Sequence, residues 1–150
     1  MGGRGQDYER ELKSILEARG FFVLRSAGSY SADIIALKGG VTLLIEVKSS
    51  SKRKIYFSPR LKGQLRSFLL ECRKAEVAPI YSFRIKGEGR EKGWMLFTAP
   101  MELRGVQSLI HRGISNLKIR GEGEDMRAEM SWDEGTPLAG FLRYVDHLVE

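Results

Sequence analysis

Three charged residues in the first half of the chain have types and spacing that suit phosphodiester chemistry. Asp33 begins one apolar segment, and Glu46 and Lys48 end the next one. Because side chains alternate along a strand, Glu46 and Lys48 point to the same face. Gly39 and Gly40 lie between the two segments and are typical of a tight hairpin turn. We therefore expect an antiparallel hairpin that brings Asp33 beside Glu46 and Lys48.

Two carboxylates beside one ammonium group can hold a hard divalent cation and act on a phosphate. Mg²⁺ takes oxygen ligands, usually one or two carboxylates together with substrate phosphate and water. Such a metal polarises the scissile phosphate and activates a water, while Lys48 can orient that water or neutralise the developing charge. The same three residues can instead form an ordinary ion-pair cluster at a sheet edge. Spacing alone leaves both interpretations open.

Two further charged residues could complete a catalytic site. Glu9 lies in an expected helix from about Gln6 to Arg19 and can supply another acidic ligand. Its alternative is an ion pair with Lys13, four residues later, on a solvated helix face. Arg25 ends a predicted strand just before a polar Gly-Ser turn, a position suited to binding phosphate.

The segments that must position these residues follow the order α-β-β-β-α-β-β. Helical spacing of apolar residues predicts a second helix that begins at Ser58-Pro59 and ends near Lys74. Short apolar runs predict five strands, at residues 21–25, 34–37, 42–48, 79–85 and 94–98. A polar stretch at 49–54 is expected to be a loop. This order is typical of a mixed α/β domain that ends near Pro100.

The character of the chain changes after Pro100, where the candidate elements are short. Residues 106–110 are expected to be helical, 117–119 extended and 121–125 a loop, and Thr136-Pro137 can begin a last helix. One face of that helix is apolar and must pack on its own domain or on a second subunit. We expect residues 1–100 to form the main domain and residues 101–150 to form an extension of it.

Charge is distributed unevenly along the 150 residues, whose net charge is +6. The first 100 residues carry 19 basic and 10 acidic side chains, whereas the last 50 carry 6 basic and 9 acidic ones. A basic first segment favours an anionic partner such as nucleic acid.

Cysteine, histidine and hydropathy exclude several other functions. The single cysteine, Cys72, cannot form a disulfide within the chain, and the two histidines are far apart without metal-ligand spacing. Zinc chemistry and Ser-His-Asp triads are therefore poorly supported. The chain shows neither an apolar export signal at its start nor a run long enough to span a membrane, so we expect a cytoplasmic protein associated with DNA and no membrane partner.

A basic stretch follows the predicted catalytic strand. It contains no acidic residue, and its basic residues are Lys48, Lys52, Arg53, Lys54, Arg60, Lys62 and Arg66. Phosphate binding is the functional interpretation, and a solvated loop without ligand is the alternative. No segment resembles a base-reading helix, so we expect recognition of DNA shape and backbone.

Taken together, the charged segments resemble the archaeal Holliday junction resolvases, a family in the nuclease superfamily with the PD-(D/E)xK signature. The matching stretches, in order between about Arg4 and Thr98, are Glu9-Arg10-Glu11-Leu12, Arg25-Ser26-Ala27-Gly28-Ser29, Asp33 and Ile45-Glu46-Val47-Lys48. The resemblance implies a restriction-endonuclease-like core with a mixed five-stranded sheet flanked by helices. It also implies a homodimer that makes paired symmetric cuts in a four-way DNA junction, with Mg²⁺ as cofactor and Mn²⁺ as a substitute.

The resemblance further implies a role for individual residues. Asp33 and Glu46 would hold the metal with Glu9 completing the acidic site, while Lys48 acts beside them and Ser29 lies near the scissile backbone. The basic stretch supplies Lys52, Arg53, Lys54, Arg60 and Lys62 as expected DNA contacts, and the resemblance adds Arg10, Arg25 and Arg84. The last of these, Arg84, stands where the family usually has lysine. Of two aromatic residues that the family often uses in its dimer contact, this chain has Phe68 but carries Cys72 at the other position.

Three other functions stay open from the sequence. One is another nuclease of the same superfamily that acts on duplex, nicked or flap DNA. A second is a DNA-binding module without catalysis. The third is a partner that recruits other recombination proteins through the last helix, and this role is compatible with catalysis.

Overall fold

The computed structural model describes residues 3–26, 32–57, 59–122 and 125–149, with the backbone alone for 3–6 and 59–62. Its helices are α1 (Gly3–Ala18), α2 (Pro59–Ala75), α3 (Gly105–Arg112) and α4 (Leu138–Asp146), and a short 3₁₀ helix, η2, spans Trp132–Glu134. Its strands are β1 (Phe22–Arg25), β2 (Ile34–Lys38), β3 (Val41–Ser50), β4 (Lys54–Tyr56), β5 (Pro79–Ile85), β6 (Trp94–Thr98), β7 (Ser115–Asn116), β8 (Lys118–Arg120), β9 (Arg127–Ser131) and β10 (Thr136–Pro137). These strands form two sheets.

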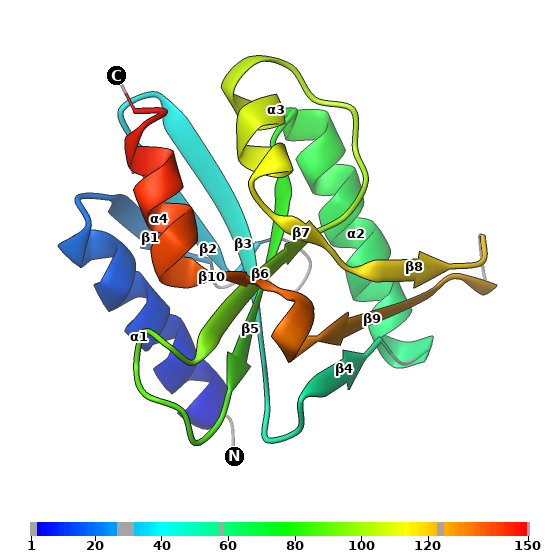
Figure 1. The fold of residues 1–150 in the computed structure, drawn as a ribbon. Helices are drawn as coiled ribbons and strands as arrows, with labels where there is room; N and C mark the ends of the chain where they lie inside the picture. Colours follow the sequence, from blue (N-terminus) through cyan, green and yellow to red (C-terminus); the bar gives the residue numbers. More distant parts are fainter. Residues whose placement is uncertain (1–2, 27–31, 58, 123–124, 150) are drawn as a thin grey trace.

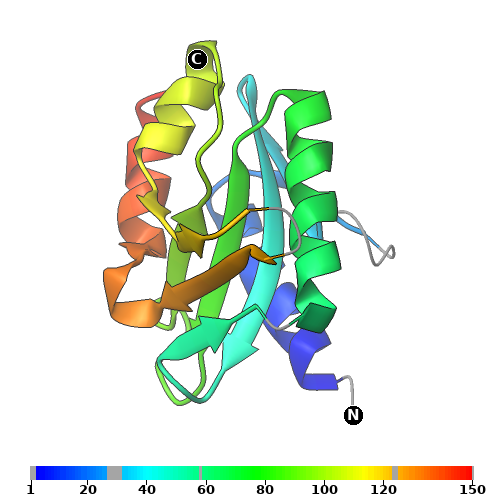
Figure 2. The same ribbon diagram turned by 90° about the vertical axis from the view of Figure 1, so that its right-hand side faces the viewer.

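The larger sheet is mixed and has the strand order β1-β2-β3-β5-β6-β10, with β7 also paired to β6. Its parallel pair β3–β5 is connected through α2, as parallel neighbours require a crossover. The smaller sheet has the order β4-β9-β8 and lies beside the lower half of α2 (Figures 1 and 2). The predicted mixed five-stranded sheet flanked by helices is confirmed, with β7 and β10 added at the β6 edge.

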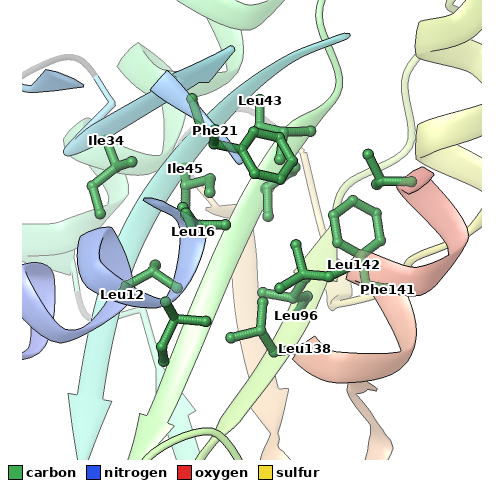
Figure 3. Close-up of a cluster of buried hydrophobic side chains, with 14 of the residues drawn as sticks. Leu12, Leu16, Phe21, Ile34, Leu43, Ile45, Leu96, Leu138, Phe141 and Leu142 are labelled. Carbon is green, nitrogen blue, oxygen red and sulfur yellow. The ribbon is translucent and has the colours of Figure 1, made fainter. Parts of the chain in front are cut away.

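Helices cover both faces of the larger sheet (Figure 1). On one face, α1 and α4 enclose an apolar cluster, part of which Figure 3 shows; it includes Leu12, Leu16, Ile34, Leu43, Ile45, Leu96, Phe141 and Leu142. On the other face, α2 and the smaller sheet enclose a second cluster that includes Leu65, Phe68, Cys72, Tyr81, Phe83, Ala128 and Met130. Alternate residues of each central strand therefore belong to different cores, and this alternation decides where each charged side chain points.

The β2–β3 hairpin has the predicted turn and register. Gly39 and Gly40 have φ of 49° and 83°, a combination that fits glycine and matches the twist of a two-residue hairpin. Ile34 pairs with Ile45, so that Asp33, one residue earlier, comes opposite Glu46. The expected antiparallel hairpin is confirmed.

One expectation for an individual segment is wrong, and one sheet was not predicted. Residues 49–54 were expected to be a loop, but β3 continues to Ser50 and β4 begins at Lys54. The strand continues because residues 48–50 pair with residues 83–85 of β5. The smaller sheet was also missed, since each of its strands has five residues or fewer and pairs with a distant part of the chain.

Residues after Pro100 pack on the same cores as the rest of the chain. Leu138, Phe141, Leu142 and Val145 of α4 belong to the first cluster, as does Ile110 of α3. Whether residues 1–100 form a separate domain stays a prediction. None of the helices in the described ranges is long and apolar enough to cross a membrane.

Candidate active site

Asp33, Glu46 and Lys48 come together on the α2 side of the hairpin. A carboxylate oxygen of Asp33, Oδ2, accepts a hydrogen bond of 2.7 Å from the backbone N–H of Val47. Lys48 Nζ lies 3.8 Å from Glu46 Oε1. Strand alternation places the last two side chains on one face, and the hairpin register adds Asp33. This is the arrangement that the sequence predicts.

Glu46 is held in an apolar environment. The residue is 7% exposed. It is paired in register with Tyr81, which belongs to the apolar cluster under α2. Burial raises the pKa of Glu46 to about 7, with a further increase from the Asp33 charge and an opposing effect of Lys48. Its Oε2 atom is buried and makes no hydrogen bond to the part of the chain that the structure describes. A buried carboxylate oxygen without a partner is costly, and binding a cation would remove that cost.

Glu9 and Arg25 form a second charged group next to the first. Arg25 donates a hydrogen bond from Nη2 to Glu9 Oε1 over 3.3 Å. Burial raises the pKa of Glu9, and the nearby Asp33 carboxylate raises it further. Burial likewise raises the pKa of Asp33, whereas the Val47 N–H and the Lys48 charge lower it. The three carboxylates thus all have raised pKa values, which is typical of acidic groups held close together for a function.

The donor set fits a hard divalent cation. Asp33 and Glu46 supply two carboxylates, and Mg²⁺ commonly needs no more than one or two from the protein. Within the described residues, no cluster of three or more His, Cys, Asp or Glu side chains has the geometry of a metal site. Glu9 is paired with Arg25, and its carboxylate is close enough to Asp33 for the Asp33 charge to raise its pKa. Glu9 could therefore join Asp33 and Glu46 when a cation binds.

Arg84 is not placed to contact DNA as predicted. It is 5% exposed, and its Nε donates to Glu11 Oε1 over 2.8 Å while its Nη1 donates to the carbonyl of Ile85 over 2.6 Å. The guanidinium also lies 5.1 Å from the centre of the Tyr8 ring. In β5 the alternation puts Arg84 on the α1 face, whereas Tyr81 lies on the face of Glu46. The correction follows from strand parity, and in this structure Arg84 fixes α1 to the sheet.

The remaining predicted DNA-binding residues are distributed around this site. Lys52 and Lys54 are exposed beside the end of β3, and Arg10 is exposed on α1 with Asp7 3.6 Å away. Arg60 and Lys62 lie in the first turn of α2, where the structure describes the backbone alone. Ser29 lies outside the described residues.

Arg53 has an acidic partner that the sequence does not indicate. Its Nη2 and Nε atoms lie 2.6 and 2.8 Å from the two carboxylate oxygens of Asp133, and its guanidinium lies 4.9 Å from the Trp132 ring centre. The bidentate contact lowers the pKa of Asp133. Eighty residues separate the pair, so no local pattern could have revealed it.

Glu11 has a structural role that the sequence did not predict. Besides Arg84, its Oε1 accepts a hydrogen bond of 2.8 Å from Trp94 Nε1. It lies half a turn of helix from Glu9, so this anchored contact fixes the rotation of α1 and the direction of Glu9. The sequence feature that could have indicated this role is the position of Glu11 in the segment Glu9-Arg10-Glu11-Leu12, which resembles the resolvase family.

A sequence model of one family, described as archaeal Holliday junction resolvase (Hjc), matches residues 1–127. The chain belongs to this family. The match continues beyond the segment from Arg4 to Thr98 that carries the resemblance, and includes β7 and β8. The strands and helices after Pro100 are therefore in part a feature of the archaeal Holliday junction resolvases.

Two curated relatives carry the name crossover junction endodeoxyribonuclease Hjc. The protein of Methanocaldococcus jannaschii is 48% identical over 65 residues, which cover 43% of this chain and 49% of the relative. The protein of Sulfurisphaera tokodaii is 43% identical over 72 residues, covering 43% of this chain and 50% of the relative. The chain thus spans about half the length of these curated relatives.

A solved structure supports the fold. The Holliday junction resolvase Hjc of Archaeoglobus fulgidus superimposes with a TM-score of 0.64 at 22% identity, covering 93% of this chain and 96% of that one. At this identity the likeness shows the resolvase fold, including the arrangement of the region after Pro100.

Proposed function

We propose that this chain is a metal-dependent endonuclease that resolves four-way DNA junctions by paired, symmetric cuts. One observation carries the proposal: the β2–β3 hairpin of a resolvase-family chain places Asp33 opposite Glu46, with Lys48 3.8 Å from the Glu46 carboxylate. Relatives named crossover junction endodeoxyribonuclease support the substrate. Its role would be in DNA recombination and repair, in the cytoplasm with the DNA.

Asp33 and Glu46 would hold Mg²⁺, for which Mn²⁺ could substitute. When bound, the cation polarises the scissile phosphate and promotes deprotonation of the attacking water. Val47 N–H holds Asp33 in place through its 2.7 Å hydrogen bond, so one ligand is oriented before the cation arrives. The Lys48 ammonium, on the same face as Glu46, lies where it can offset the negative charge that develops on the phosphate.

Arg25 would hold the DNA backbone beside the reacting group. Its side chain is 29% exposed and its only described acidic partner is Glu9, at 3.3 Å. A guanidinium binds phosphate in a bidentate manner, so a phosphate can replace Glu9 as the partner. Release of Glu9 from this contact would make its carboxylate free to join Asp33 at the metal.

A homodimer would supply two equivalent sites for the two equivalent strands of a junction. An exposed apolar patch on the α2 side of strands β1 and β2 supports this dimer. Its residues Phe22, Leu24 and Leu37 are 62%, 46% and 38% exposed. Phe22 and Leu37 are register partners, so the apolar side chains are adjacent. Phe68 and Cys72 are buried in the monomer core instead, so the contact cannot use the family's aromatic pair.

The cleavage experiment compares an immobile four-way junction with a linear duplex of the same arms, in Mg²⁺ and in chelator. Asp33→Ala and Glu46→Ala should each abolish cleavage and leave junction binding intact, whereas Glu102→Ala, at an exposed carboxylate in the loop before α3, should cut normally. Paired nicks on the junction alone support the proposal. Equal cleavage of the duplex would refute junction selectivity, and binding without cleavage in any metal would refute catalysis.

The dimer has its own test. Leu24→Asp should convert a dimer to a monomer in sedimentation equilibrium and replace paired nicks by single ones. Leu109→Asp introduces the same charge at a leucine of α3 that is 40% exposed, and it should change neither result. A wild-type chain that sediments as a monomer when bound to the junction would contradict the two-fold arrangement.

A further inference from the structure

The smaller sheet has an apolar face and a charged face. Ile55, Ile119, Ala128 and Met130 pack into the cluster under α2. Alternation then directs the intervening residues to the outside, where they form a basic face defined by Lys54, Tyr56, Lys118, Arg120, Arg127 and Glu129. Five of these, with Ala128, line a pocket of about 240 Å³; they are Tyr56, Lys118, Arg120, Arg127 and Glu129.

The basic face places two arginines directly opposite each other. Arg120 pairs with Arg127 across β8 and β9. Like charges in such a pair destabilise the sheet unless an anion lies between or over them. Neither guanidinium makes an ion pair or side-chain hydrogen bond to the described part of the chain. An anionic ligand would therefore find two guanidinium groups on neighbouring strands that form no ion pair with a described carboxylate.

Four described acidic residues lie in or beside the basic face. Glu129 is the only carboxylate among its six defining residues. Lys118 has a partner in Glu134 at 3.3 Å, on η2. Glu122 and Asp125 are exposed in the turn between β8 and β9 and form no ion pair with a described residue. Of the six defining residues four are basic and one is acidic, so the face itself carries more positive than negative charge, although residues 101–150 carry more acidic than basic residues overall.

Tyr56 gives the basic face an aromatic surface. It is 63% exposed, the highest value among the exposed large apolar and aromatic residues that the structure describes. It shares a row with Glu129 and Lys118 and lines the same pocket as the two arginines. Surfaces that combine an exposed aromatic ring with basic side chains are typical of sites for unpaired nucleic-acid strands, on which a base stacks while its phosphates contact the cations.

We propose that the basic face binds an unpaired or distorted DNA strand next to the branch point, with Arg120 and Arg127 on phosphates and a base on Tyr56. This inference rests on the proposed function for its substrate. The pocket volume and exposed ring favour a splayed nucleotide over an intact duplex, in which bases are stacked and cannot reach Tyr56.

The basic face is close enough to the active site to contact the same DNA. Tyr56 follows Lys48 by eight residues, which span at most about 28 Å when fully extended. This limit is shorter than one turn of duplex, about 34 Å. Both views place the β3–β4 connection at the same end of the molecule as the N-terminus and the first turn of α2 (Figures 1 and 2).

The test measures binding of fluorescent DNA in Ca²⁺ without Mg²⁺, over a range of salt concentrations. Arg120→Gln/Arg127→Gln should weaken junction binding and reduce the slope of log K against log salt by about 1.5–2, since two phosphate contacts are lost. The matched control, Arg104→Gln/Arg112→Gln, removes the same charge from exposed positions at α3, at the opposite end of the molecule, and should leave the slope unchanged.

Tyr56 tests the stacking component separately. Tyr56→Val keeps a strand-forming residue and should reduce affinity for a junction with unpaired bases at its centre by about fivefold or more, whereas Tyr56→Phe should bind as wild type. Thermal melting confirms that each variant is folded. Equal effects of Tyr56→Val on perfect duplex and on junction would overturn the stacking assignment.

Failure of this inference is distinguishable from failure of the proposed function. If wild type cuts the junction and the Arg120/Arg127 double variant retains the wild-type salt slope, the basic face does not bind DNA and the proposed function stands. If wild type binds but never cuts while the double variant loses slope, the basic face is supported and catalysis is refuted.

Discussion

The buried carboxylate of Glu46 should destabilise the metal-free protein, and Glu46→Gln should remove this effect. In the folded chain burial raises the pKa of Glu46 from its ordinary value of 4.5 to about 7. Below pH 4.5 the side chain is protonated in both folded and unfolded chains and costs nothing. Between pH 4.5 and 7 the unfolded chain loses this proton first, so stability falls as the pH rises. Above pH 7 the full cost is present.

The expected size follows from the two pKa values. Each pH unit between them corresponds to about 1.4 kcal/mol, so wild type should lose about 3 kcal/mol relative to Glu46→Gln between pH 4.5 and pH 8. For a chain of 150 residues, one kcal/mol shifts the melting temperature by about 2–4 °C. The difference in melting temperature between the two proteins should therefore change by about 6–12 °C. Comparing two proteins cancels the titration of groups that they share.

The measurement is calorimetric or spectroscopic melting of both proteins in chelator at pH 4.5 and pH 8. Glu102→Gln, at an exposed carboxylate, is the matched control and should differ from wild type equally at both values. Adding Mg²⁺ at pH 8 to about 100 times its dissociation constant should raise wild-type stability by about 2.7 kcal/mol. The Glu46→Gln protein, which lacks one of the proposed ligands, should gain much less.

Two results would refute this reasoning. A difference between wild type and Glu46→Gln that stays constant with pH would mean that the carboxylate is hydrated in the metal-free chain. Equal stabilisation of both proteins by Mg²⁺ would mean that the cation binds elsewhere, and the assignment of Glu46 as a ligand would then be wrong.

Three further predictions concern Glu11, Asp133 and Cys72. Glu11→Gln leaves the buried Arg84 without its anionic partner and should cost about 3 kcal/mol of stability by denaturant unfolding, whereas a change below 1 kcal/mol would show that the pair does not fix α1. Asp133→Asn removes an exposed partner of Arg53, so the melting temperature should hardly change while junction affinity rises; unchanged affinity would mean that Arg53 does not reach the DNA. Burial raises the pKa of Cys72 to about 12, so its thiol should resist alkylation at pH 8 until the chain is unfolded, and rapid labelling of the native protein would contradict its burial.

The centre of the site could be predicted because it depends on local geometry. The two-residue periodicity of β3 fixes the relative direction of Glu46 and Lys48, and the turn at Gly39-Gly40 sets the register that adds Asp33. Both signals lie within sixteen residues of sequence. The helices and five main strands were predictable for a similar reason, since their apolar patterns are continuous.

Residues that depend on distant pairing could not be placed in the same way. Predicting that Arg84 is buried requires the register of β5 against β3 and the position of α1, because only these show that it faces Glu11. The partner of Arg53 lies 80 residues later in the chain. The smaller sheet joins β4 to strands more than sixty residues away, and short strands carry little periodic signal.

The contacts of Arg25 and Arg53 have a consequence for how this chain would respond to salt. Each guanidinium already has a carboxylate partner, Glu9 at 3.3 Å and Asp133 at 2.6 Å. When a phosphate replaces that carboxylate, the displaced carboxylate stays close to the DNA and reduces the effective positive charge that the protein brings to it. Arg25 and Arg53 should therefore each contribute less to the salt slope than a cation without a described carboxylate partner, such as Arg120 or Arg127. The slope should then underestimate the number of phosphate contacts.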